Sequence, residues 1–126
     1  MNGPVAQAVS GNPAFAEQYI GFRNASHDAL GQALTAQVRH AVAQVHGLDF
    51  APGDAAAPKL IDDRATQICV SYARRMPFEH TAITDAEAAE VVEAIGEPGY
   101  VALSVVAALA DAECRAAMVD LPGLAA

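Results

Sequence analysis

Apolar residues recur at helical spacing in five stretches of the chain, and no stretch shows the alternation that marks a convincing strand. The pattern predicts helices over residues 13–24, 27–46, 63–76, 85–95 and 98–118. The third stretch is the most clearly amphipathic, and the residues of its apolar face are Ala65, Ile68, Cys69, Tyr72, Ala73 and Met76. The fifth is apolar nearly all round from Tyr100 to Ala110, as is typical of a helix with neighbours on most sides. We therefore expect one all-α domain over residues 1–126, a bundle of about five helices with the fifth at its centre.

Residues that favour helix ends support these boundaries. The expected N-caps are Asn12, Ser26, Asp62 or Asp63, and Thr84, which begins a capping box with Glu87. The expected stops are Gly47, Pro77 and Gly96. Residues 48–61 hold two prolines and one glycine, so we expect a connector there without a regular element.

Composition and charge narrow the class of protein. Hydrophobic residues make up 53% of the 126 residues and charged residues 17%, which excludes an intrinsically disordered chain. Seven Lys and Arg against 15 Asp and Glu give a formal charge of −8, which disfavours nucleic acid and anionic membranes as partners. The stretch from Tyr100 to Ala110 has 11 residues, whereas a membrane span needs about 20. The first residues lack the features of a signal peptide, so we expect a cytoplasmic protein.

The cysteines and histidines do not form a metal or redox motif in the sequence. Cys69 and Cys114 share no CxxC spacing, and we expect two reduced, buried thiols. No two histidines stand three or four residues apart, so the sequence predicts neither a helical metal site nor any cofactor.

Two segments carry a resemblance to a known family. Residues 30–47 read LGQALTAQVRHAVAQVHG, which resembles the signature helix of the alkylhydroperoxidase D-like superfamily that includes the carboxymuconolactone decarboxylases. Residues 83–106 read ITDAEAAEVVEAIGEPGYVALSVV and, with the ADAECR that follows, resemble that family's closing segment. The two matches cover roughly two thirds of the chain. The resemblance implies the helical fold of that superfamily, a small-molecule substrate or ligand, and a homo-oligomer, either a trimer or a hexamer.

The redox residues of that family are missing. In an alignment without gaps, the family's proton-relay Glu falls on Ala36, its two Cys fall on Leu48 and Ala51, and its His falls on Ala55. None of these side chains forms a thiolate or carries a proton. The sequence therefore predicts that the protein is not a peroxidase or a disulfide reductase.

His46 is the first candidate for chemistry, because it ends the second predicted helix where the family has an Asn. An imidazole is an acid or a base near neutral pH. The alternative is an exposed residue that is favoured only by the helix dipole. Candidate binding residues are Arg39, Glu79 and His80, with Glu79 and His80 adjacent in the loop after the third helix.

Other polar residues have mainly structural interpretations. We expect His40 to face away from the apolar stripe, into solvent or an interface, and His27 to be exposed. Asp111 and Arg115 form an i, i+4 pair, on the same stripe of the fifth helix as Ser104. Such a pair either satisfies itself or binds a polar ligand if that stripe is buried.

Two functions remain open from the sequence. The first is a cofactor-independent lyase, isomerase or cyclase that acts on a small organic substrate, with His46 as acid and base. The second is a non-catalytic ligand-binding or assembly protein with a degenerate fold of the same family. A second ionisable group opposite His46 would favour the first, and the sequence does not place one.

Overall fold

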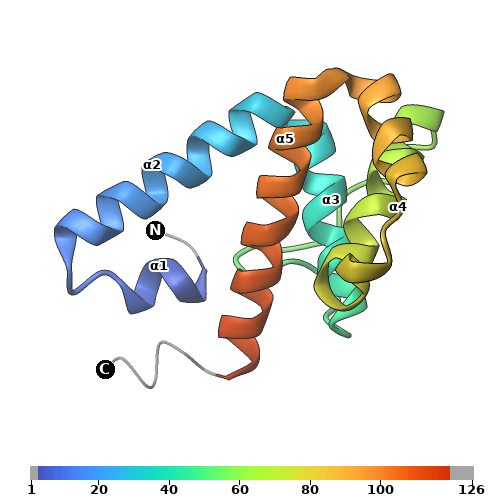
Figure 1. Cartoon of the computed structure of the whole chain (residues 1–126). Helices are drawn as coiled ribbons and strands as arrows, with labels where there is room; N and C mark the ends of the chain where they lie inside the picture. Colours follow the sequence, from blue (N-terminus) through green and yellow to red (C-terminus); the bar gives the residue numbers. More distant parts are fainter. Residues whose placement is uncertain (1–2, 120–126) are drawn as a thin grey trace.

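Every regular element in the described part of the chain, residues 3–119 of a computed structural model, is helical (Figure 1). The elements are α1 (Pro4–Ala8), α2 (Pro13–Leu30), α3 (Gln32–Val45), α4 (Arg64–Glu79), the 3-10 turn η1 (His80–Ala82) and α5 (Asp85–Met118). The expected all-α class is confirmed.

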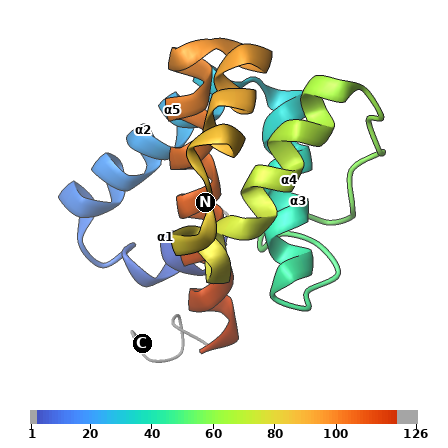
Figure 2. The same ribbon diagram turned by 45° about the vertical axis from the view of Figure 1, so that its right-hand side comes forward.

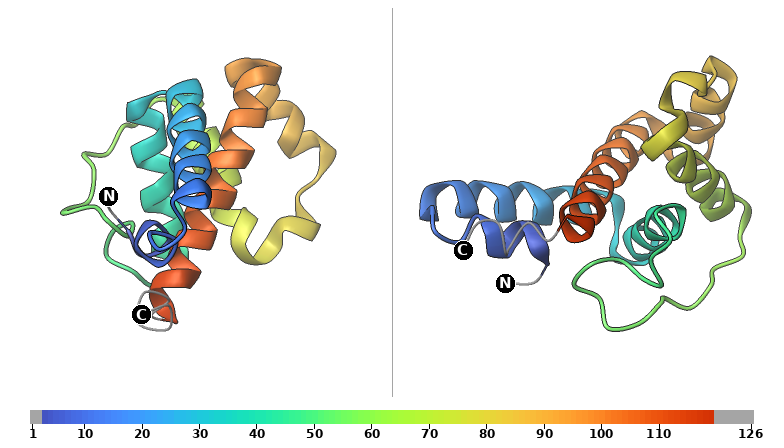
Figure 3. Two further views of the ribbon diagram at one scale, coloured as in Figure 1. Left: turned by 90° about the vertical axis from the view of Figure 1, so that its left-hand side faces the viewer. Right: turned by 90° about the horizontal axis from the view of Figure 1, so that it is seen from below.

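The C-terminal part of α5 lies between two groups of helices, as expected of its apolar surface. The α1–α2 pair lies on one side of it, and α3 with α4 on the other (Figures 1 and 3). The largest fully buried side chains come from α3, α4 and α5, and they are Leu103, Val38, Val42, Val91, Val106, Cys69 and Cys114. The apolar patterns that predicted these three helices therefore mark the faces that form the core.

Gly96 interrupts α5, as the sequence predicts. Its backbone has φ 81° and ψ 167°, a conformation that is essentially restricted to glycine. Residues 85–95 therefore form a short first segment, which begins with the predicted capping box of Thr84 and Glu87. The rest of α5 turns away from this segment and enters the core (Figure 1).

The boundary between the first two predicted helices is wrong. Ser26 does not cap a helix, because its hydroxyl donates to the carbonyl of Arg23 within α2 at 2.9 Å. The helix continues to Leu30 and breaks at Gly31, which has φ 95° and ψ 146°. Position 31 thus ends α2 and precedes α3.

One further boundary and one additional helix differ from the expectation. Helix α4 continues through Pro77 to Glu79, because a proline in the last turn removes only a local hydrogen bond. The expected start of α4 is confirmed, with the Asp63 side chain accepting from the Thr66 N–H at 2.8 Å. Helix α1 was not predicted.

Helix α2 extends away from the core as an arm (Figure 3). Two of its aromatic side chains, Phe15 and Phe22, are 54% and 57% exposed. They do not cover α5, although their spacing predicted an apolar face for this helix. On the other side of the molecule, the connector, which spans residues 46–63 in the structure instead of the expected 48–61, passes around α3 to reach α4 (Figure 2).

Candidate functional site

The strongest candidate site joins the end of α3 to α5. His46 follows the last residue of α3, and its Nε2 lies 2.7 Å from Oδ1 of Asp111. Arg115, one turn further along α5, donates from Nε to the same oxygen at 3.0 Å and from Nη2 to the Pro77 carbonyl at 3.0 Å. The Asp111–Arg115 pair is thus present and it holds the imidazole, a link that the sequence did not reveal.

This arrangement fixes the tautomer of His46. An ionised carboxylate only accepts hydrogen bonds, so a neutral His46 carries its proton on Nε2 and leaves a lone pair on Nδ1. Nδ1 is buried and has no hydrogen-bond partner among residues 3–119. It is therefore the nitrogen that can act as a base.

A shallow apolar groove of about 300 Å³ lies beside the imidazole, lined by His46, Phe78, Arg115, Met118 and Val119. The Phe78 ring meets the His46 ring edge to face, with centroids 5.1 Å apart. The Arg115 guanidinium lies 5.1 Å from the centre of the Phe78 ring. The His46 side chain is only 1% exposed, so the prediction of an exposed helix-end residue is wrong.

Arg39 lies in a different place from His46 and has a structural role. Its Nη1 donates to both oxygens of Asp54, at 2.8 and 2.9 Å, and its Nη2 donates to the Pro52 carbonyl at 2.9 Å. These contacts hold the start of the connector against α3. Its Nη2 is also 3.8 Å from Oε1 of Glu113, so contacts within the fold hold the guanidinium in place.

Glu113 is the centre of a buried polar cluster that sequence reasoning missed. The residue is 3% exposed and accepts hydrogen bonds at Oε2 from Arg23 Nε, at 2.7 Å, and from the Tyr19 hydroxyl. Burial, and next the bond to Glu113, raise the pKa of Tyr19 far above its usual value. The cluster joins the arm to α5. The sequence did contain one sign of this cluster. Glu113 stands seven residues after Val106, which places both residues on the buried face of α5.

The remaining predicted residues do not join His46. Glu79 and His80 are exposed, and neither side chain makes a hydrogen bond or ion pair within residues 3–119. His27 is half-buried instead of exposed, and burial, with the Arg23 charge second, lowers its pKa. His40 is also half-buried, because the connector covers its side of α3.

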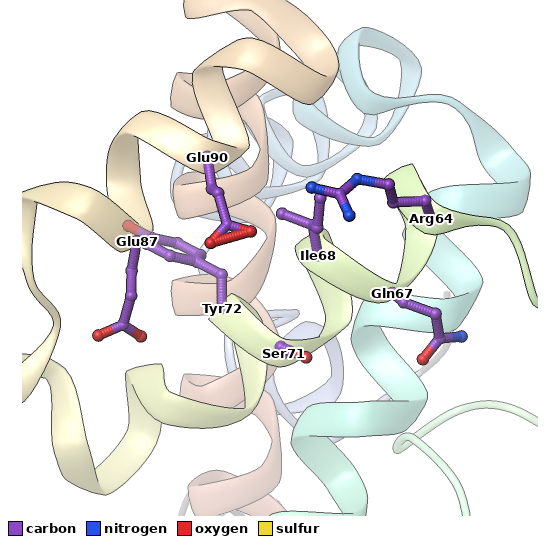
Figure 4. A pocket seen from close by; sticks show the side chains of 7 residues that line it. All are labelled: Arg64, Gln67, Ile68, Ser71, Tyr72, Glu87 and Glu90. Carbon is purple, nitrogen blue, oxygen red and sulfur yellow. The ribbon is translucent and has the colours of Figure 1, made fainter.

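A second groove lies between α4 and the first segment of α5 (Figure 4). It encloses about 390 Å³ and is lined by Arg64, Gln67, Ile68, Ser71, Tyr72, Glu87 and Glu90. Arg75 binds Glu87 and is the main cause of its lowered pKa. Burial raises the pKa of Tyr72, whose hydroxyl lies 3.1 Å from Ser104 Oγ. Neither group is poised for acid–base chemistry near neutral pH.

The two thiols are buried and separate, as expected. Burial raises the pKa of both Cys69 and Cys114 to about 11. At neutral pH both are therefore almost entirely in the thiol form, which is a poor nucleophile.

Comparison with known families, curated proteins and solved structures finds no match to the chain. Among the described helices, α5 is long and apolar enough to cross a membrane by length and composition alone. The core helix of a soluble protein meets the same criterion, and α5 contacts each of α1, α2, α3 and α4.

Proposed function

We propose that the protein catalyses proton transfer on a small unsaturated carboxylic acid without a cofactor, with His46 as acid and base. The observation that carries this proposal is the 2.7 Å contact of His46 Nε2 with Asp111, which leaves Nδ1 as the basic nitrogen. Asp111 is the second ionisable group that this reading of the sequence required.

The groove suits an apolar acid. Phe78 and Met118 offer apolar surface, and Arg115 has N–H groups beyond the two that bind Asp111 and Pro77. In the proposed step, Nδ1 removes a proton from a carbon next to the substrate carboxylate. The electron pair of the broken C–H bond delocalises toward that carboxylate beside Arg115. The imidazolium, stabilised by Asp111, then returns the proton to another carbon, so the reaction is an isomerisation without net redox change.

The resemblance to the carboxymuconolactone decarboxylases supports this class of reaction, since that branch needs no cysteine pair. We also propose, on the same resemblance, a cytoplasmic homo-oligomer that shares the alkylhydroperoxidase D-like fold. The exposed Phe15 and Phe22 on the arm supply apolar surface for self-association.

One observation favours a second function, a non-catalytic ligand-binding protein. Because the His46 side chain is 1% exposed and its Nδ1 is buried, a substrate reaches Nδ1 only after neighbouring side chains move aside. A ligand that stays in the outer groove would meet Arg115 and Phe78 without contacting the base.

Deuterium exchange separates the two functions. Unsaturated C4 to C8 mono- and dicarboxylic acids and their lactones are incubated with the protein in D2O, and exchange at carbon is followed by NMR. The catalytic proposal expects exchange with the wild type and with the exposed-residue control His80→Gln, and none with His46→Gln. Binding of an acid without exchange in any variant supports the non-catalytic function. Failure of every acid to bind overturns both.

A further inference from the structure

A small polar hollow lies on the opposite face of α3, under the connector. Figure 2 shows the path of this connector from α3 to α4. It encloses about 170 Å³, and its walls are Gln37, His40, Ala41, Gln44, Pro58, Leu60, Gln67, Val70 and Arg74. No lining residue is acidic, although the chain has 15 Asp and Glu against seven Lys and Arg. Among the lining residues only Arg74, which is exposed, has a fixed charge, so the wall carries one positive charge within an acidic protein.

Two glutamines hold the roof of this hollow in place. Gln37 on α3 donates from Nε2 to the Lys59 carbonyl at 2.6 Å, and Gln67 on α4 donates from Nε2 to the Ile61 carbonyl at 3.0 Å. These bonds fix the connector from both helices, so that Pro58 and the largely exposed Leu60 contribute to one side of the hollow. The site is thus built by side-chain contacts and is not a chance gap under a loose loop.

Three lining residues carry hydrogen-bond donors: the half-buried His40 and the exposed Gln44 and Arg74. Arg74 donates from Nη2 to Gln44 Oε1 at 3.3 Å, which orients the Gln44 amide and leaves its NH2 group as a donor. His40 Nδ1 is buried without a partner in the described chain, so a neutral imidazole is more stable with its proton on Nε2. The guanidinium keeps several N–H groups that are not used by Gln44.

We infer that this hollow binds a small oxyanion, either a phosphate or a short carboxylate. A guanidinium beside amide and imidazole N–H groups matches the several acceptor oxygens of such an ion. The volume is below the roughly 300 Å³ at which pockets for drug-sized ligands begin, so the ligand has only a few heavy atoms. The site is separate from the His46 groove, and the two share no lining residue.

Calorimetric titration tests the inference with inorganic phosphate and acetate in separate experiments at constant ionic strength, with chloride as the reference. We expect saturable binding of one ion per chain for phosphate or acetate, and the ion that binds identifies the source of the oxygens. Arg74→Gln and His40→Gln should each weaken that binding, with about a tenfold loss for Arg74→Gln. Circular dichroism shows whether each variant keeps its helices.

Arg64→Gln is the matched control. Arg64 is on the same helix as Arg74, but it lines the groove between α4 and the first segment of α5, as Glu90 does. This variant and His46→Gln should both bind the ion like the wild type, which keeps this test independent of the proposed catalysis. An adventitious ion only, seen as non-saturable binding or as an equal loss in Arg64→Gln and Arg74→Gln, overturns the inference. So does the absence of binding of both ions.

Discussion

His46 and Asp111 are 65 positions apart in the chain, yet the His46 Nε2 lies 2.7 Å from the Asp111 carboxylate. The contact joins the end of α3 to the C-terminal part of α5, so it contributes to the fold as well as to the proposed chemistry.

We expect His46→Ala to lower the free energy of unfolding by about 2–3 kcal/mol. The change removes a hydrogen bond to a charged group and leaves a cavity next to Phe78. Urea unfolding measures the loss. The exposed His80→Ala should stay within about 0.5 kcal/mol of the wild type. Equal stability of both variants would show that the imidazole is not packed as described.

Glu113→Gln should destabilise the protein by about 3 kcal/mol, because it removes a buried charge that faces Arg23 and Arg39. Glu93→Gln on the exposed side of α5 is the control, with an expected change below about 0.5 kcal/mol. Chemical unfolding monitored by circular dichroism compares them. Similar small effects would contradict the description of Glu113 as the buried anchor of the arm.

The cysteines should react slowly in the folded protein. With a pKa of about 11 for each, Cys69 and Cys114 have only about 0.03% thiolate at pH 7.5. Alkylation by iodoacetamide should speed up about tenfold per pH unit between pH 7 and 9 and reach ordinary rates in urea. For the same reason we expect no dithiol-dependent peroxide reduction. Turnover that is lost in Cys69→Ala would refute both the missing redox motif and the inert thiol.

Asp63 should make α4 sensitive to acid. The Thr66 N–H, followed by the Thr66 hydroxyl, lowers the pKa of this carboxyl in the folded protein. A lowered folded pKa gives stability that is present above the unfolded value, near 4, and is lost as pH falls below it. Asp63→Asn keeps a capping side chain without the charge, so its melting temperature should fall less steeply between pH 5 and 2. Parallel curves for the two proteins would argue against this cap.

Self-association should depend on the arm. Light scattering coupled to size exclusion should give a mass that is a multiple of the 13.0 kDa chain. Phe22→Ser, which replaces an exposed aromatic, should shift the mass toward one chain, whereas Phe50→Ser in the connector should not. A wild-type mass near 13 kDa at micromolar concentration contradicts the oligomer.

Local signals predicted the all-α class and several of the helix ends. The caps at Asn12, Asp63 and Thr84 and the break at Gly96 depend on neighbours in sequence, so they are visible in a single chain. The predicted helix boundary at Ser26 was wrong because a serine hydroxyl can either cap a helix or donate to the carbonyl of the preceding turn. The sequence does not choose between these two alternatives.

The site was harder to predict, because its contacts join distant segments. The pattern identified His46 and also the Asp111–Arg115 pair, but only the packing of α3 on α5 brings them together. Arg39 was a candidate binding residue that no other feature of the sequence supported. Its true partners, Asp54 and the Pro52 carbonyl, lie in a connector whose path the sequence did not define.

The break at Gly31 determines which copy of the chain the arm packs against. Gly31 alone separates α2 from α3, in a backbone conformation that other residues strongly disfavour. Alanine at this position would favour one continuous helix from Pro13 to Val45, which would pull the arm away from its own Glu113. The vacated carboxylate could then receive Tyr19 and Arg23 from a second copy, which is domain swapping. A single residue without a side chain thus keeps the arm packed against the Glu113 of its own chain.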